Sequence, residues 1–433
     1  MDNKIPQVDH LILLVGSNPL PNLVVADVLV KEGGSVYLLC TNETSTLAGN
    51  LKTMIAQKKN LMNNQVQVMN INTIEGTQIK APTSTSIADR IKEISSPITE
   101  GFIGLNYTGG TKFMGIHSYL ALKAYANELD KACKNEIQVQ LSYLDAANMS
   151  LIIDEQKSSI TLRNKTNIFF DDIIKLHGWS YQKKPSDNPK HLDCANYILE
   201  IMLKNESEWK TWRGWLRKVR NETGQPPSKK KQSFKVEQDE QVVCNIFGQI
   251  TGNIQATCNS LCFDIPKIGE PEKAFKWLEG GWFEDIVFDT LQKTEFYIND
   301  TSFKFDELLL DIEMKSESGV ETQIDVIARI DFQFFLFSIT TDDTKGLCKS
   351  KLMEANIRAR QIAGDEACAA LICLADKRTS GAIQNELSSL FEGKKDKIHV
   401  FGRDDWKNDE NDEGNKPRIV SEIRDWVSTN INK

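Results

Sequence analysis

Short apolar runs alternate with helix-like segments over the first 155 residues of the chain. Such runs have the length of β-strands, and strands that are joined by helices form a mostly parallel sheet. The pattern therefore predicts an α/β fold with a Rossmann-like sheet. We expect strands at Leu11–Val15, Val36–Cys40, Val66–Ile71, Phe102–Asn106 and Val139–Leu144, helices at Leu20–Lys31, Ser45–Lys58, Ser84–Ile94 and Thr111–Leu129, and an antiparallel edge strand at Met149–Ile153.

The rest of the chain changes its pattern twice. Residues 156–270 are irregular, with a helical pattern at Asp193–Lys218 and a loop signal at Thr223–Lys231. From residue 271 onward, helices are expected at Gly281–Gln292, Leu347–Ala363 and Arg418–Thr429, and strands at Gln323–Ile330, Phe334–Thr340 and Ala369–Leu374. We therefore predict three parts: a Rossmann-like domain at 1–155, an α-rich connecting segment at 156–270 and an α/β domain at 271–433.

The composition is that of a globular protein. Of the 433 residues, 40% are hydrophobic, and the net charge of -8 disfavours a surface that binds nucleic acid everywhere. Nine scattered cysteines without a paired CxxC motif indicate reduced thiols. No early apolar run is long enough for a secretion signal or a membrane span. We therefore expect a cytoplasmic protein that does not contact membranes.

One segment opposes the overall acidity. Between Lys204 and Lys235 there are ten basic residues and three acidic ones, and Trp209, Trp212 and Trp215 lie among them. The basic side chains could contact phosphates with little sequence preference, although a solvated helix and loop would have the same composition. Trp209, Trp212, Leu216 and Val219 have helical spacing, which favours a packed stripe over a platform for stacking bases.

Two loops that follow strands of the first domain carry glycines and polar residues. They read Gly-Ser-Asn-Pro at 16–19 and Asn-Tyr-Thr-Gly-Gly-Thr-Lys at 106–112. Parallel sheets bind ligands at the carboxyl ends of their strands, and glycines before a helix let backbone N–H groups approach an anion. The second loop is thus either a phosphate site or a plain turn and helix cap. Neither loop has the GxGxxG or P-loop pattern, which disfavours nicotinamide and ATP.

In a Rossmann-like domain these loops resemble those of CARF domains, the sensor modules of type III CRISPR ancillary effectors. The resemblance covers about the first 155 residues and implies a homodimer that binds one cyclic oligoadenylate across both subunits. A two-fold dimer needs an even ring, so cyclic tetra-adenylate is the expected activator. Thr41 and Asn42 are further candidate contacts from their position alone. The contacts that the resemblance implies are Ser17, Asn18, Pro19, Thr108, Gly109, Gly110, Thr111 and Lys112.

The last third of the chain carries a second polar pattern. Glu284 follows Gly-Gly-Trp-Phe at the start of an expected helix, Asp325 lies on an expected strand, and the next strand ends in Ser-Ile-Thr at 338–340. This order resembles CARF-linked PD-(D/E)xK nucleases. The resemblance implies that Glu284 and Asp325 hold Mg²⁺ or Mn²⁺, which activates water. For Glu284 alone, a solvated helix face is the plain alternative, whereas an unpaired buried Asp325 would be costly.

The chain departs from this family where the family has Glu-x-Lys. Ser338-x-Thr340 supplies neither the second carboxylate nor the ammonium, and hydroxyls are poor ligands for a hard cation. Three explanations stay open. The site uses Thr340, Thr341 and Asp342 for another chemistry, the domain is a non-catalytic remnant that binds nucleic acid, or the charges have moved, to Asp342 or Glu354 for the carboxylate and to Lys345, Lys349 or Lys351 for the cation.

Two main hypotheses for the function follow. The first is a metal-dependent nuclease of type III CRISPR antiviral defence that cyclic oligoadenylate activates and that cuts DNA and/or RNA. Its catalytic candidates are Glu284, Asp325, Thr340, Lys345 and Lys349. The alternative is a ligand-gated protein that binds nucleic acid or regulates a partner and has a dead nuclease fold. A third possibility is that the first domain slowly cleaves its ring ligand.

Overall fold

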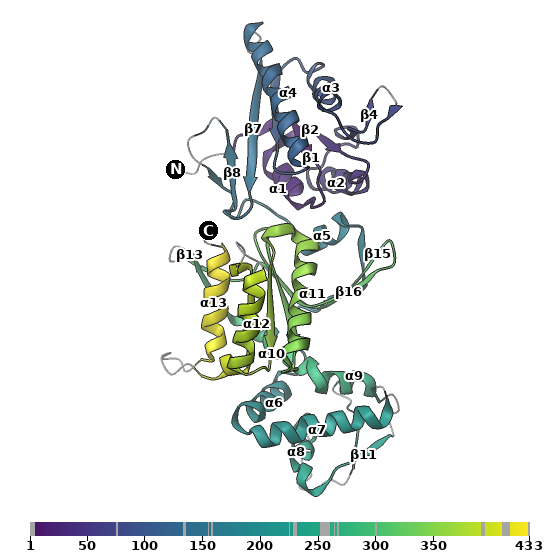
Figure 1. Cartoon of the computed structure of the whole chain (residues 1–433), viewed down its shortest axis with the longest axis vertical. Coiled ribbons are helices and arrows are strands. Elements are labelled where there is room, and N and C mark those ends of the chain that lie inside the picture. Colours follow the sequence, from purple (N-terminus) through teal and green to yellow (C-terminus); the bar gives the residue numbers. More distant parts are fainter. Residues whose placement is uncertain are drawn as a thin grey trace.

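Three units follow one another along the longest axis of the molecule (Figure 1). A domain with a seven-stranded sheet lies at one end, a domain with a six-stranded sheet lies in the middle, and a helical unit lies at the other end. The computed structural model describes residues 5–431, except 75–76, 133–135, 155, 157–158, 225, 228–231, 252–259, 264, 266–267, 299–300, 391–394 and 409–415.

The seven-stranded sheet has the order β3-β2-β1-β6-β7-β8-β9. Its first five strands are parallel, and β8 and β9 are antiparallel to their neighbours. All five predicted parallel strands and the antiparallel strand β8 are confirmed, but β8 is not at the edge of the sheet, because β9 pairs with it. The strands are β1 (Val8–Leu14), β2 (Val30–Cys40), β3 (Val66–Asn70), β6 (Gly101–Asn106), β7 (Ile137–Asp145), β8 (Ser150–Ile153) and β9 (Ile160–Thr161).

Helices pack in two pairs beside this sheet. α1 (Leu20–Leu29) contacts α2 (Ser45–Lys58), and α3 (Ser84–Ser95) contacts α4 (Lys112–Lys131). The α1 and α2 side chains belong to an apolar core that continues into the middle domain, whereas α3 and α4 share a separate core with the sheet. A small hairpin of β4 (Thr73–Ile74) and β5 (Thr77–Gln78) precedes α3.

The six-stranded sheet of the middle domain has the order β10-β15-β16-β17-β18-β19. Its first four strands are antiparallel, whereas β17, β18 and β19 are parallel. The strands are β10 (Trp179–Lys183), β15 (Glu307–Ser316), β16 (Glu321–Ile330), β17 (Gln333–Thr340), β18 (Cys368–Cys373) and β19 (Ile398–Phe401). The three strands predicted from sequence are confirmed, and β10, β15 and β19 were not predicted.

Four long helices belong to the middle domain. α10 (Trp282–Lys293) packs against β15, β16 and β17, α11 (Lys345–Ala363) against β17 and β18, and α12 (Lys377–Leu390) against β19. α13 (Arg418–Ile431) packs on the hairpin of β13 (Phe296–Ile298) and β14 (Thr301–Phe303) and on β-sheet phenylalanines. α5 (Phe170–Leu176) leads from the first domain into β10.

The helical unit is inserted between β10 and α10. It contains α6 (Leu192–Lys204), α7 (Glu206–Thr223), α8 (Gln241–Thr251) and α9 (Pro271–Lys276), with a hairpin of β11 (Ser233–Lys235) and β12 (Ser260–Cys262). The single helix that was predicted for Asp193–Lys218 is wrong, because Asn205 ends α6 and caps α7 by accepting the Glu208 N–H at 3.2 Å. Trp209, Trp212, Leu216 and Val219 are buried, which confirms the packed stripe.

The chain therefore crosses the middle domain twice. It passes through β10, builds the helical unit at the far end, and returns through α10 to complete the same sheet (Figure 1). The predicted boundary between residues 270 and 271 places β10 in the connecting segment, whereas β10 pairs with β15 in the sheet of the middle domain. No helix among the described residues is long and apolar enough to cross a membrane. The expectation that all cysteines are reduced thiols is wrong, because Cys244 is disulfide-bonded.

Candidate functional site

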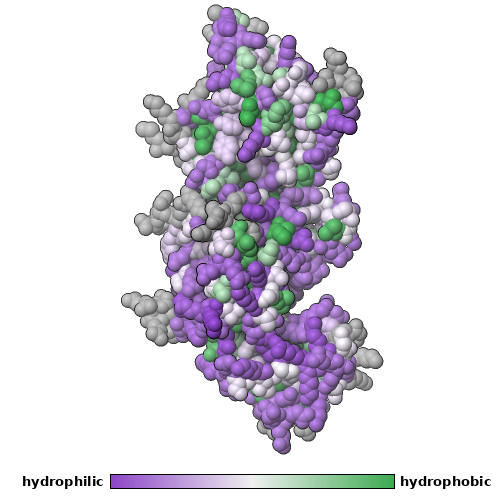
Figure 2. Space-filling view, viewed as in Figure 1, coloured by the Kyte–Doolittle hydropathy of each residue, from purple (hydrophilic) through white to green (hydrophobic). Residues whose placement is uncertain are grey.

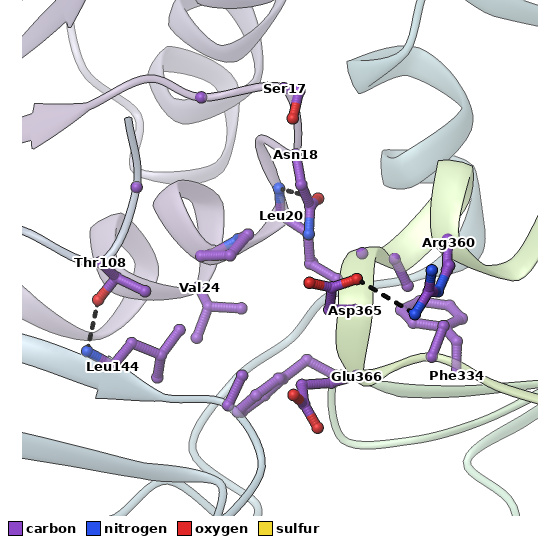
Figure 3. A pocket seen from close by; sticks show the side chains of 18 of the residues that line it. Ser17, Asn18, Leu20, Val24, Thr108, Leu144, Phe334, Arg360, Asp365 and Glu366 are labelled. Carbon is purple, nitrogen blue, oxygen red and sulfur yellow. Dashed lines mark hydrogen bonds and ion pairs between the residues drawn. The ribbon is translucent and has the colours of Figure 1, made fainter. Parts of the chain in front are cut away.

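A cavity of about 1090 Å³ lies where the first domain meets the middle domain (Figure 3). The loops after β1 and β6 form one wall, and the end of α11 with the residues after it forms the other. β1 and β6 are neighbours at the point where the strand order of the sheet reverses, and this is where open α/β sheets bind ligands. The volume is at the upper end of the range for small-molecule sites.

Asn18 connects the loop after β1 to the middle domain. Its side-chain oxygen accepts a hydrogen bond from the Leu20 N–H at 3.1 Å, at the start of α1. Its side-chain nitrogen lies against Gly364, since a Cβ added there would be 2.0 Å from Asn18 Nδ2. Gly364 follows α11 directly and has φ +78°, a conformation that favours glycine. One side chain thus lies against both the ligand loop and the end of a middle-domain helix.

The two glycines of the second loop are fixed by the backbone around them. A Cβ on Gly109 would be 2.1 Å from the Leu14 carbonyl oxygen, and Gly110 has φ +72°. The Thr108 hydroxyl accepts a hydrogen bond from the Leu144 N–H at 2.6 Å (Figure 3). The loop is therefore held between β1 and β7, and its glycines bring the backbone to the cavity surface.

Half of the predicted ligand contacts line the cavity, namely Ser17, Asn18, Thr108, Gly109 and Gly110. Pro19, Thr111 and Lys112 belong to the same loops but lie outside the lining. Thr111 caps α4 by accepting the Met114 N–H at 3.2 Å, and Lys112 is exposed at the first position of that helix.

The other two predicted contacts lie in a separate polar network. The Thr41 N–H donates to the Thr44 hydroxyl at 3.1 Å, and the Asn42 N–H donates to the Asn72 side-chain oxygen at 3.2 Å. Neither Thr41 nor Asn42 lines the cavity. The structure thus joins the loops after β1 and β6 in one site and places the loop after β2 beside them, engaged with its own neighbours.

Sequence reasoning missed the middle-domain wall of the cavity. Arg360, Asp365 and Glu366 lie there, at and just after the end of α11 (Figure 3). Arg360 is 3.7 Å from Asp365, and Glu366 pairs with Lys397 at 3.0 Å. These residues are about 250 positions from the nearest ligand loop in sequence, and no local motif marks them. Only the packing of the two domains brings them to the site.

Glu284 and Asp325 come together in the middle domain. Glu284 lies in the first turn of α10, and Asp325 lies on β16 just before the pairing of β16 with β17 begins at Val326 and Phe337. The Asp325 carboxylate fills this fork, where it accepts hydrogen bonds from the Ile339 N–H at 2.7 Å and from the Ser338 hydroxyl at 3.4 Å. The fork holds this carboxylate in a fixed position beside Glu284.

The two carboxylates share a desolvated environment. Burial, together with the nearby charge of Asp325, raises the pKa of Glu284 to about 8. Burial also raises the pKa of Asp325, while the hydrogen bond from Ile339 opposes the shift. Two half-buried carboxylates near each other repel when both are ionised, so the pair is stabilised by a nearby cation. The plain alternative for Glu284, a side chain on a solvated helix face, does not fit this environment.

The other three catalytic candidates lie apart from this pair. The Thr340 hydroxyl accepts the Asp342 N–H at 3.2 Å. Lys345 and Lys349 both form ion pairs with Glu386 on α12, the second at 3.3 Å. The structure therefore joins Glu284 with Asp325 and directs both lysines to another helix.

Two charged residues that were not in the predicted catalytic set lie at the pair instead. Asp311, on β15, has φ +57° and lies between the register pairs Leu310–Val326 and Ile312–Ile324, opposite Asp325. It forms an ion pair with Lys183 on β10. Lys351, on α11, lowers the pKa of both Glu284 and Asp325 through its positive charge. Sequence reasoning had named Lys351 among three lysines and had not named Asp311.

Carboxylate oxygens are suitable ligands for a hard divalent cation, but these carboxylates are too few to coordinate one fully. Among the described residues, no three His, Cys, Asp or Glu side chains lie close enough to form a metal-binding group. Mg²⁺ is commonly bound by one or two carboxylates together with water and substrate phosphates. Glu284 and Asp325 satisfy that smaller requirement.

The basic residues of the helical unit are mostly paired. Lys210 pairs with Glu206, Lys218 lies near Glu237 and Glu240, Arg220 pairs with Glu279, and Arg213 pairs with Asp343 of the middle domain at 2.9 Å. Arg217 is exposed, and in the described part of the chain it has no ion pair. Lys229, Lys230 and Lys231 lie outside the described residues. Figure 2 shows that hydrophilic residues cover most of the visible face of this unit.

The sequence matches no protein-family model and no curated protein. Solved structures do match its fold. Protein VC1899 from Vibrio cholerae aligns with a TM-score of 0.68 at 12% identity over 98% of both chains. Can2 from Sulfobacillus thermosulfidooxidans, solved in complex with cyclic tetra-adenylate, aligns with a TM-score of 0.62 at 14% identity, again over 98% of both chains.

The chain has the fold of Can2. This confirms the predicted α/β fold class, in which a Rossmann-like domain is followed by an α-rich segment and a second α/β domain. The alignment spans nearly the whole of both chains, so it includes the helical unit as well.

Proposed function

We propose that this protein is a cytoplasmic CRISPR ancillary effector that binds a cyclic oligoadenylate and then cuts nucleic acid with the help of Mg²⁺ or Mn²⁺. One observation carries the proposal: a large cavity is lined by both ligand loops and by the end of α11, and an earlier stretch of that helix borders a second cavity that Asp325 lines. Occupation of the cavity can therefore act on the catalytic domain through a rigid element.

The activator that we propose is cyclic tetra-adenylate, bound by two copies of the chain. Phe113, Ile116 and Leu120 are 42%, 58% and 55% exposed, and their spacing places them on one side of α4, directly after Lys112. Large exposed apolar side chains at helical spacing suit contact with a second copy. In such a dimer a ring that extends beyond one cavity would pass the exposed Lys112. Lys112 could therefore contact the ring although it does not line the cavity of its own chain.

The chemistry that we propose is hydrolysis of phosphodiester bonds in DNA or RNA. Glu284 and Asp325 would hold the metal ion, and that ion would supply a polarised water and neutralise phosphate charge. The fork between β16 and β17 fixes Asp325, and the first turn of α10 fixes Glu284. Neither carboxylate needs to move far, so the site would be organised before substrate arrives.

The experiment combines ligand, metal and substrate. The full chain is incubated with cyclic tetra-adenylate, cyclic hexa-adenylate or neither, in Mn²⁺ or Mg²⁺, and offered supercoiled plasmid and labelled RNA. We expect cutting that depends on one ring and that falls at least about 100-fold in Asp325→Ala, because a metal ligand is removed. Calorimetry with the same ring is the control, since Asp325 is remote from the cavity and its loss should leave ligand affinity unchanged.

A second function is favoured by the absence of Glu-x-Lys at positions 338–340. The protein would then bind nucleic acid or a partner when the ring is present, without cutting. Ring binding with no cutting of either substrate in any metal would support this alternative. Chromatography of the ring after incubation reports whether the first domain cleaves its own ligand. Failure to bind either ring would reject both functions.

A further inference from the structure

A cavity of about 360 Å³ lies beside Asp325, apart from the large cavity between the domains. Asp325, in the first half of β16, and Ser338, near the end of β17, line the cavity together with one face of α11. The lining residues of α11 include Leu347, Ser350, Lys351, Glu354 and Arg358. These positions follow the repeat of a helix, so a single face of α11 borders the cavity. The cavity therefore joins the fork to charged groups of α11.

Lys351 differs from the other two lysines of this helix. Lys345 and Lys349 are held by Glu386 on α12, on the side away from the fork. Lys351 is partly buried, borders the cavity, and within the described residues forms no ion pair or hydrogen bond. An ammonium group with three donors and no partner near two half-buried carboxylates is available to an anionic ligand.

Charge balance points the same way. Glu284, Asp311 and Asp325 bring three carboxylates to one region, and Lys183 balances Asp311. Of the cations near Glu284 and Asp325, Lys351 acts on both. The strand position that would otherwise supply an ammonium holds Thr340, whose hydroxyl is turned to Asp342. The charge missing from β17 is thus present on α11.

We propose that Lys351 supplies the catalytic cation of this site, and that its ammonium group binds the phosphodiester of the nucleic acid beside Asp325. The inference rests on the proposed nuclease function and names a residue for it. In the reaction, a water oxygen forms a bond to phosphorus, the bond from phosphorus to the leaving sugar oxygen breaks, the water loses a proton to solvent, and the leaving oxygen gains one. Lys351 stays protonated and stabilises the charge on the phosphate oxygens.

The test compares lysines two positions apart on one helix. Lys351→Met keeps most of the apolar stem and removes the charge, and Lys351→Ala removes both. Lys349→Ala is the matched control, because its ammonium is paired with Glu386. We expect ring-dependent cutting to fall roughly 100-fold in both Lys351 variants, and to change less than about threefold in Lys349→Ala, since only an exposed ion pair is lost. Thermal unfolding checks that all three variants fold.

A binding measurement separates this inference from the nuclease function itself. Anisotropy of a labelled single-stranded DNA or RNA is measured with the ring present and with EDTA, so that no cutting occurs. We expect Lys351→Met to weaken binding about tenfold, as for the loss of one charged hydrogen bond, with Lys349→Ala unchanged. If the wild type binds but never cuts, this result still supports Lys351 as the phosphodiester contact. Equal behaviour of the Lys351 and Lys349 variants, or no binding by the wild type, would overturn the inference.

Discussion

The two candidate sites are built from different parts of the chain. The cavity between the domains depends on backbone, because Gly109, Gly110 and Gly364 occupy places or conformations that suit only glycine. The carboxylate site depends on side chains, with Glu284 from α10, Asp325 from β16 and Lys351 from α11. A site that is built from backbone needs particular residues at consecutive positions of one loop. A site that is built from side chains can receive the same charge from a residue on any of several neighbouring helices or strands.

This difference explains why one motif is intact and the other is altered. The Thr-Gly-Gly-Thr-Lys loop must follow β6 directly, since its glycines fit against Leu14. An ammonium group beside Asp325 can come from β17 or from a helix that packs on β17, and α11 does so. Loss of a residue from the backbone site should therefore be harder to compensate than loss from the side-chain site.

Among changes to the backbone site, the largest expected effect comes from Gly109→Ala. The new Cβ would lie 2.1 Å from the Leu14 carbonyl oxygen, so the loop must move away from β1. Overpacking of this kind costs about 1–3 kcal/mol or more, and displacement of the loop should weaken ring binding at least tenfold. Calorimetry with cyclic tetra-adenylate and thermal unfolding measure the two effects.

Gly49→Ala is the control for this variant. Gly49 lies within α2, and a Cβ there would meet no atom within 4 Å. Alanine is preferred over glycine inside a helix by about 1 kcal/mol, so this variant should be slightly more stable and should bind the ring normally. Normal ring affinity in Gly109→Ala would contradict a site built on backbone.

Gly364→Ala should have the next largest effect, because it alters the contact between the two regions. Gly364 has φ +78° and ψ -160°, a region almost restricted to glycine, and the added Cβ would displace Asn18. We expect a loss of about 1–3 kcal/mol in stability and a ring-dependent activation that is reduced more than ring affinity. The ratio of cutting rates with and without saturating ring measures activation.

Gly346→Ala serves as the comparison for Gly364, since it lies in the first turn of the same helix with open space around it. This variant should activate normally. If Gly364→Ala also activates normally while its stability falls, Asn18 and the end of α11 do not transmit ligand binding.

Much of the first domain followed from its sequence because each strand is a compact apolar run between helices. β10 and β15 did not, since β10 is a short polar edge strand and β15 mixes carboxylates and a lysine with its apolar residues. The break at Asn205 was missed because the apolar spacing continues from Met202 to Trp209 across it. Periodicity reports which face is buried, and it does not report where a cap interrupts the helix.

The carboxylate pair was predictable from residue types, and its cation was not. Lys349 and Lys351 are two positions apart and so point to different sides of α11. Sequence alone does not say which side faces the fork, because that depends on how α11 packs against β17 and α12. The middle-domain wall of the large cavity was beyond prediction for the same reason.

The smallest expected effect concerns a charge that the middle domain does not compensate. Burial lowers the pKa of His399 to about 4, although Asp405 opposes the shift, and its ring lies against Phe401 and Trp426. The folded pKa lies below the unfolded value of 6.5, so stability is complete above pH 6.5 and is lost as the pH falls toward 4. Between pH 7.5 and 5.5 the loss should be about 1 kcal/mol. Thermal unfolding of His399→Phe should show a weaker dependence on pH over this range than the wild type. An unchanged dependence would show that the imidazole is already charged in the folded protein.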